Sequence, residues 1–121
     1  MNHKAKSIRT FIGAKDFEVS RSFYRDLGFE ERIISAGMSV FQTDGGLAFY
    51  LQKYYVKDWV NNTMVFMEVD DAARFWDELV ALNLPAKYKN VRLIPIKNED
   101  WGRECFIIDP SGILWHFGEF F

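Results

Sequence analysis

The feature that most constrains this sequence is that its second half repeats the order of secondary-structure patterns found in its first half. Residues 7–14 alternate apolar and polar side chains, which predicts a strand, and residues 17–28 carry apolar side chains at helical spacing. Three further strand patterns follow at residues 30–35, 38–42 and 47–51, separated by turn-forming residues. The first half therefore predicts a strand, a helix and three strands.

The second half predicts the same order of elements. Residues 63–69 form a strand pattern, a helical pattern follows it, and residues 83–88 interrupt that helix. Three strand patterns then complete the half, at residues 91–96, 103–108 and 113–120. An internal duplication of a βαβββ module explains this repetition.

Capping residues and apolar spacing define the two predicted helices. Asp16 is placed to cap the first helix and Gly28 to end it, while Asp70 or Asp71 is placed to cap the second. The side chains expected to face the core are Val19, Phe23 and Leu27 in the first helix, and Phe75, Leu79 and Leu82 in the second.

Size and module length together predict one domain. Each half of the 121-residue chain is small for independent folding, so we expect the two modules to share one core. The expected fold class is α+β, with module one at about residues 7–52 and module two at about residues 62–121, forming a curved mixed sheet with a concave pocket.

Charge and cysteine content argue against several kinds of partner and compartment. The formal net charge is −2 and the Lys and Arg residues are scattered, so neither nucleic acid nor a membrane surface is an expected partner. The single cysteine, Cys105, excludes an internal disulfide, and its expected role is that of a small buried residue. With no signal-peptide pattern at the N-terminus, we expect a cytoplasmic location.

Alternation along three strands separates a core face from an open face. The uniformly apolar positions, expected in the core, are Ile8, Ile12, Ala14, Val65, Met67, Val69, Ile113, Trp115 and Phe117. The opposite positions combine aromatic and polar side chains: Arg9, Phe11, Met64, Phe66, Glu68 and His116. A wall of this composition indicates a small-molecule site.

Several motifs resemble those of one known superfamily. The helix DFEVSRSFYRDLGF, the segment WGRE, the turn DPSG and the ending WHF resemble the vicinal oxygen chelate superfamily, which includes glyoxalases, dioxygenases and bleomycin-resistance proteins. The resemblance is greatest to the bleomycin-resistance branch and spans nearly the whole chain. It implies paired βαβββ modules, a symmetric homodimer with pockets at or near the subunit interface, and metal-free binding of a drug-like aromatic molecule.

The metal-dependent members of this superfamily hold a divalent ion at four positions, on the first and last strands of each module. The resemblance places these positions on Arg9, on Phe49 with a one-residue ambiguity toward Tyr50, on Met64 and on His116. Only His116 is an ordinary ligand of a divalent ion, and working sites use three or four protein ligands. We therefore expect no metal and no other cofactor.

The predicted ligand-binding residues are Arg9, Phe11, Phe49, Met64, Phe66, Glu68, Trp101 and His116. His116 is either a wall of the pocket or a general base, and Glu68 either pairs with Arg9 or contacts the ligand. The resemblance implies that Trp101 lines the groove, and a subunit contact is the other interpretation. The alternative function is a lyase or isomerase of the glyoxalase or dioxygenase type that uses His116 and Glu68, with or without a metal.

The remaining polar and aromatic residues have mainly structural interpretations. Asp109 is expected to organise the DPSG turn, while Arg103 and Glu104 are expected to be solvated or structural. The segment of residues 53–59 between the modules is rich in rings, which indicates a flap over the pocket or a subunit contact.

Overall fold

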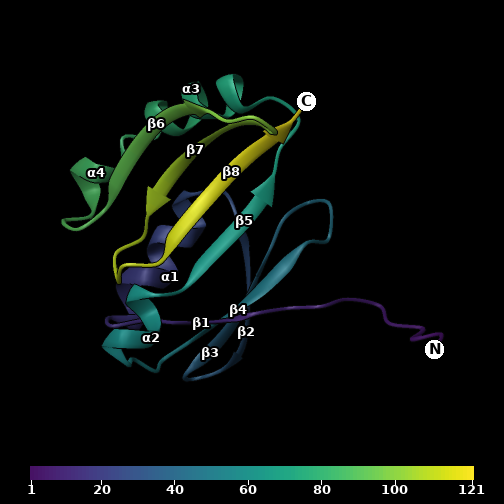
Figure 1. Ribbon diagram of the computed structural model, residues 1–121. Helices are drawn as coiled ribbons and strands as arrows, with labels where there is room; N and C mark the ends of the chain where they lie inside the picture. The colour runs from purple at the N-terminus through teal and green to yellow at the C-terminus, as the bar shows by residue number, and fades with distance from the viewer.

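The computed structural model describes all of residues 1–121 (Figure 1). The first half contains β1 (Phe11–Gly13), α1 (Phe17–Asp26), β2 (Glu30–Ser35), β3 (Met38–Gln42) and β4 (Ala48–Gln52). The short helix α2 (Lys57–Asn61) follows. The second half contains β5 (Met64–Glu68), α3 (Ala72–Ala81), α4 (Leu84–Lys87), β6 (Arg92–Asn98), β7 (Gly102–Ile108) and β8 (Leu114–Phe120).

The strands form two four-stranded mixed sheets, in the orders β1-β4-β3-β2 and β5-β8-β7-β6. In each sheet the first strand runs parallel to the last strand of its module, and the remaining pairs are antiparallel. The α+β class and the tandem βαβββ order are therefore confirmed. Helix α1 packs against β2 and β4, and α3 packs against β6, β7 and β8, so each sheet has one face covered by its own helix.

Aspartate caps begin the two long helices. The Asp16 carboxylate accepts a hydrogen bond from the backbone N–H of Val19 at 3.2 Å, and Asp71 accepts one from Arg74 at 3.0 Å. Asp71, and not Asp70, is thus the cap of α3. Gly28 follows α1 with a φ of 106°, a conformation that favours glycine and ends the helix.

The two halves share one core. Trp115 of β8 lies against Phe49 of β4, with ring centroids 5.1 Å apart, and against Tyr24 of α1 at 5.8 Å. These rings belong to a single cluster of 19 buried residues drawn from both halves. Cys105 is also in this cluster, and burial raises the pKa of its thiol to about 11, so the expected inert, buried role is confirmed.

A buried polar network joins the halves through the turn between β7 and β8. One oxygen of Asp109 accepts hydrogen bonds from the backbone N–H groups of Ser111, Gly112 and Ile113 at 2.8 to 2.9 Å, which confirms its predicted role in the DPSG turn. Its other oxygen accepts a hydrogen bond from the Tyr24 hydroxyl at 2.6 Å. Burial raises the pKa of Asp109 in spite of these donors, and Trp115 Nε1 completes the network by donating to the Tyr24 hydroxyl oxygen at 2.9 Å.

The N-terminal strand is shorter than the alternation predicts. Residues 1–10 form no strand, and the N-terminal end of this segment extends away from the body of the molecule (Figure 1). Ile8, predicted in the core, is 99% exposed, because a strand pattern buries side chains only where a neighbouring strand and a helix cover it. Val19 and Leu82 are also exposed, so the buried stripes of α1 and α3 are narrower than predicted.

A short helix that the sequence patterns did not predict follows the second long helix. Residues 84–87 form the short helix α4, whose first turn contains Pro85. The longest helices, α1 and α3, have ten residues each, and no helix in the structure has the length and apolar character needed to cross a membrane.

Candidate functional site

The uncovered side of the β5–β8 sheet carries a cluster of aromatic rings, which we call the aromatic face: Phe66, Trp101, Phe106, His116 and Phe120. Ring centroids lie 5.9 Å apart for Phe66 and Trp101, 5.1 Å for Trp101 and Phe120, and 5.0 Å for Phe106 and His116. Phe66 remains 45% exposed. An exposed aromatic cluster of this kind is a candidate binding surface.

Gly118 makes room for these rings. It lies on β8 beneath Phe66 and Trp101, and a Cβ atom at this position would overlap the Phe66 ring and lie 3.2 Å from the Trp101 ring. The absence of a side chain at residue 118 therefore allows the two rings to lie flat against the strand.

A buried carboxylate orients the only histidine on this face. Glu104 of β7 is 6% exposed, and its Oε1 lies 2.5 Å from Nδ1 of His116. An ionised carboxylate only accepts hydrogen bonds, so Nδ1 carries the proton that makes this contact. The other ring nitrogen, Nε2, lies on the open side of the sheet, 3.4 Å from the sulfur of Met64. The prediction that Glu104 is solvated or structural missed this role, whereas Arg103 has a structural one because it pairs with Glu119 at 3.0 Å.

The first sheet has an equivalent arrangement at the same places in its module. Phe11 is paired with Tyr50 across β1 and β4, as Phe66 is paired with His116 across β5 and β8. The rings of Phe11 and Tyr50 are stacked with centroids 4.7 Å apart, and Arg9 Nη1 donates to the Tyr50 hydroxyl at 3.4 Å. Tyr50 is therefore the counterpart of His116.

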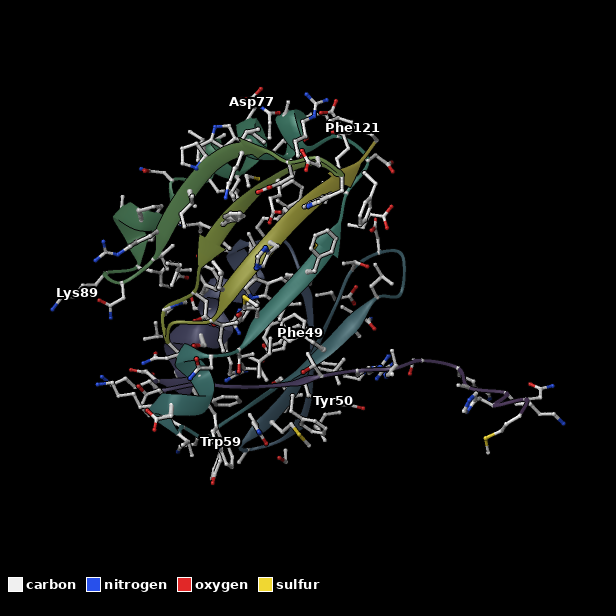
Figure 2. The ribbon with its side chains drawn as sticks, viewed as in Figure 1. Phe49, Tyr50, Trp59, Asp77, Lys89 and Phe121 are labelled. Atoms are coloured by element: carbon white, nitrogen blue, oxygen red, sulfur yellow. The ribbon has the colours of Figure 1, made fainter.

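This register corrects the placement of Phe49. Phe49 is 4% exposed and lies on the core side of β4, between the two sheets, whereas Tyr50 lies on the opposite side of the strand (Figure 2). A shift of one residue moves a side chain to the other face of a strand, and the Gly45-Gly46 turn leaves that shift undetermined in the sequence. The ambiguity is resolved in favour of Tyr50.

The four positions that the resemblance assigns to a metal thus fall on Arg9, Tyr50, Met64 and His116. A guanidinium, a phenol, a thioether and one imidazole are not the donor set of a divalent metal site, and no three His, Cys, Asp or Glu side chains gather elsewhere in a suitable arrangement. These residues do not fit the metal that the superfamily uses.

A cavity of about 700 Å³ lies between the halves, where residues 8–10, β4 and β5 meet. It is mostly apolar, and four of the predicted site residues line it: Arg9, Phe49, Phe66 and Glu68. Arg9 and Glu68 form no ion pair, since the guanidinium lies against Tyr50 instead. Phe49 forms part of the cavity wall although almost all of its surface is covered.

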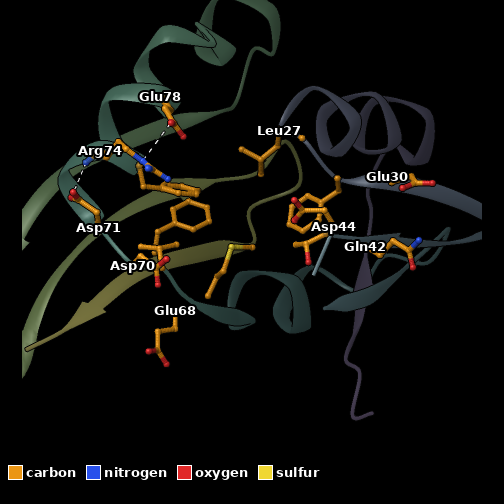
Figure 3. A pocket seen from close by; sticks show the side chains of 16 residues that line it. Leu27, Glu30, Gln42, Asp44, Glu68, Asp70, Asp71, Arg74 and Glu78 are labelled. Atoms are coloured by element: carbon orange, nitrogen blue, oxygen red, sulfur yellow. Dashed lines mark hydrogen bonds and ion pairs between the residues drawn. The ribbon is translucent and has the colours of Figure 1, made fainter. Parts of the chain in front are cut away.

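A second cavity of about 720 Å³ opens between the halves near the start of α3. Figure 3 shows carboxylates from both halves around it, including Glu30, Asp44, Glu68 and Asp70. Arg74 is the one basic residue of its lining, and its Nε lies 3.6 Å from Glu78. The sequence analysis did not predict this cavity.

The predicted site residues therefore fall into separate groups. Met64, Phe66, Trp101 and His116 lie together on the aromatic face. Arg9 and Phe11 lie around Tyr50 on the first sheet, and Glu68 lines both cavities. Four residues near these groups were not among the predicted site residues. Phe106 and Phe120 belong to the aromatic face, Glu104 contacts His116 on it, and Tyr50 lies beside Phe11 on the first sheet.

No family model matches the sequence, and no curated protein matches it. Solved structures do match: a bleomycin-binding protein complexed with bleomycin has a TM-score of 0.78 and 18% identity, covering 95% of this chain and 98% of that one.

Two further structures are similar over nearly their whole length. The bleomycin-binding protein from Streptomyces verticillus, complexed with copper(II)-bleomycin, has a TM-score of 0.78 and 21% identity, covering 94% of this chain and 95% of that one. TnmS3, an antibiotic binding protein from Streptomyces sp. CB03234, has a TM-score of 0.77 and 16% identity, covering 99% and 100%. The chain thus has the vicinal oxygen chelate fold, as the resemblance implied.

Proposed function

We propose that this protein binds a small aromatic molecule reversibly and without a metal, using the aromatic face of its second sheet. The observation that carries the proposal is the cluster of exposed rings around His116, on a side of the sheet that α3 does not cover. Each well-stacked aromatic contact contributes about 0.5–1.5 kcal/mol beyond its buried area. The likeness to bleomycin-binding proteins supports this function at the level of the fold.

We also propose that the working form is a homodimer with the ligand at or near the subunit interface. Small-molecule sites commonly cover about 70–90% of the ligand surface, which one open sheet face does not achieve. Exposed apolar side chains on both sheets and on the N-terminal tail, among them Ile8, Phe11 and Met64, offer surface for a second copy to cover. Sedimentation equilibrium tests this assembly, and a purely monomeric protein at micromolar concentration contradicts it.

Binding is tested by thermal unfolding in the presence of bleomycin and a panel of aromatic antibiotics and metabolites. A ligand present at 100 times its Kd adds about 2.7 kcal/mol to the free energy of unfolding, which raises the melting temperature measurably. The variant Phe66→Ala should lose most of the shift, whereas Val80→Ala, which removes an exposed apolar side chain from α3 on the other side of the second sheet, should keep it. A panel in which no aromatic compound raises the melting temperature contradicts the proposal.

An enzyme is the second candidate function, and the contact between Glu104 and His116 favours it. A histidine whose Nδ1 proton is held by a carboxylate presents its other nitrogen as a general base. Glu104 takes the place that the sequence analysis gave to Glu68. Turnover of a bound compound that is abolished in His116→Ala would establish this alternative, while stoichiometric binding without turnover supports the binding protein. We propose a cytoplasmic location for either function, in keeping with one buried thiol.

A further inference from the structure

The contact between Glu104 and His116 is not shared with any other charged group. In the β6–β7 register Lys97 lies opposite Glu104, but its ammonium pairs with Glu99 at 3.3 Å. Arg103, the neighbour of Glu104 along β7, pairs with Glu119. His116 is therefore the one side-chain hydrogen-bond partner of a carboxylate that is almost completely covered, and this partnership fixes both the position of the ring and the proton on Nδ1.

Nε2 of the same ring has no hydrogen-bond donor in the chain. Its one polar neighbour is the Met64 sulfur at 3.4 Å, and a thioether accepts hydrogen bonds weakly and donates none. The Met64 side chain is 64% exposed, so a ligand can displace it at little cost. Phe66 and Phe106 lie on either side of the imidazole, with centroids 6.2 and 5.0 Å from it. In the neutral ring, whose single proton lies on Nδ1 toward Glu104, Nε2 is thus an acceptor without a donor in an aromatic surrounding.

We propose that the ligand is an aromatic compound with an acidic hydroxyl group, a phenol, whose O–H donates to Nε2 of His116 while its ring contacts Phe66. Glu104 is the positioning residue, because it holds the imidazole through Nδ1 and balances the charge that the ring gains if the phenol proton moves to Nε2. Only the phenol O–H bond is affected, and the Nδ1 proton stays between the imidazole and Glu104. The inference rests on the proposed binding function and assigns the chemical class of its ligand.

The probe is 4-nitrophenol, compared with 4-nitroanisole, which has the same ring and nitro group but a methyl ether in place of the hydroxyl. The 121-residue chain should bind 4-nitrophenol about tenfold more tightly than 4-nitroanisole, which corresponds to ~1.4 kcal/mol. The absorption spectrum gives a second readout, since the phenolate absorbs at longer wavelength than the phenol. Bound 4-nitrophenol should therefore show a spectrum displaced toward that of the phenolate.

Two variants separate the positioning role from general structural damage. Glu104→Gln keeps the size of the side chain and an acceptor for Nδ1 but removes the charge, so it should lose the spectral displacement and most of the preference for the phenol. His116→Gln should lose both the spectral displacement and the preference for the phenol. If one of the two variants fails to fold, the other still tests the contact. His3→Gln, which removes the other histidine on the exposed tail, should behave as the wild type. His3→Gln should also keep the wild-type affinity for 4-nitroanisole.

The outcomes distinguish this inference from the function on which it rests. Equal affinity of the wild type for both compounds, with no spectral displacement, overturns the phenol inference and leaves aromatic binding in place. A phenol preference that persists in Glu104→Gln overturns the positioning role of Glu104. If neither compound binds but another aromatic ligand without a hydroxyl does, the inference is again overturned, and if no aromatic ligand binds, the proposed function fails with it.

Discussion

The open faces of the two sheets have the same backbone plan and different chemistry. Phe11 and Phe66 occupy equivalent positions, and each lies beside a polar ring, Tyr50 in the first sheet and His116 in the second. The buried residue that orients that ring is present in only one sheet, because the position of Glu104 corresponds to Met38 in the first. The two sheets thus share the same strand pairing but not the same side chains. Glu104 is the difference, because it orients the His116 ring on the second sheet and has no counterpart on the first.

The largest expected effect tests which side of β4 belongs to the core. Phe49→Ala and Trp115→Ala, at equivalent core positions, should each lower the free energy of unfolding by about 3–5 kcal/mol. Tyr50→Ala, one residue further along β4, should cost much less because its side chain lies on the open face. Urea unfolding measures all three variants, and a cost for Tyr50→Ala as large as that for Phe49→Ala would contradict the register described here.

The next effect concerns an ion-pair network found only in the first half. Burial alone raises the pKa of Glu31, but hydrogen bonds from Arg21, Ser39 and Arg25 outweigh it and lower the pKa to about 2. A lowered folded pKa stabilises the protein above the ordinary pKa of glutamate, and this contribution, about 3 kcal/mol, is lost as the pH falls from about 5 toward 2.

The measurement is the free energy of unfolding between pH 6 and pH 3 for the wild type and for Glu31→Gln, whose uncharged amide does not titrate. The difference between the two proteins should shrink steadily as the pH is lowered. Glu18→Gln, at the exposed end of the same network, is the control and should follow the wild type closely. A difference that stays constant with pH would show that Glu31 does not supply this stability.

A smaller effect is expected at the glycine beneath the aromatic rings. Gly118→Ala should displace Phe66, lower the free energy of unfolding by about 1–2 kcal/mol and weaken aromatic binding. Gln52→Ala, at the equivalent position in the first sheet, should change stability by less than about 0.5 kcal/mol. Denaturant titration and ligand titration check the pair, and identical behaviour of the two variants would remove the distinction between the faces.

The smallest effect is expected from making the first sheet more like the second. Arg9→Met gives the first sheet the residue that the second has at position 64, and removes only the exposed contact with Tyr50. Its cost should stay within about 0.5 kcal/mol, as for most exposed substitutions. Unfolding and binding of 4-nitrophenol should both match the wild type, and a marked loss of binding would assign Arg9 to the ligand site.

Local patterns in the sequence were sufficient to predict most of the fold. Turn formers and alternation predicted β2 and β3 with their observed bounds, and the capping carboxylates located the starts of α1 and α3. The prediction of a strand was wrong at residues 7–10. Alternation shows which side chains of a strand would share a face, but it does not show whether a neighbouring strand is present to pair with it.

The candidate site was less predictable because it depends on register. Phe49 and Tyr50 are both aromatic, so composition does not reveal a shift of one residue between them. Glu104 lies next to Arg103 in the sequence, and charged residues on strands are usually exposed, so nothing local indicates that it is buried against His116. Counting strand pairs outward from the DPSG turn would have placed Glu104 and His116 on the same face of the sheet.

The contact of Tyr24 with Asp109 also bears on how the chain acquires its structure during synthesis. Helix α1 emerges from the ribosome early, and its Tyr24 hydroxyl has no acceptor until residue 109 and the turn that follows have been made. The core rings that close over this hydroxyl include Trp115, from the last strand of the protein. The N-terminal half should therefore remain protease-sensitive on the ribosome and become protected only once β8 has left the exit tunnel and can insert.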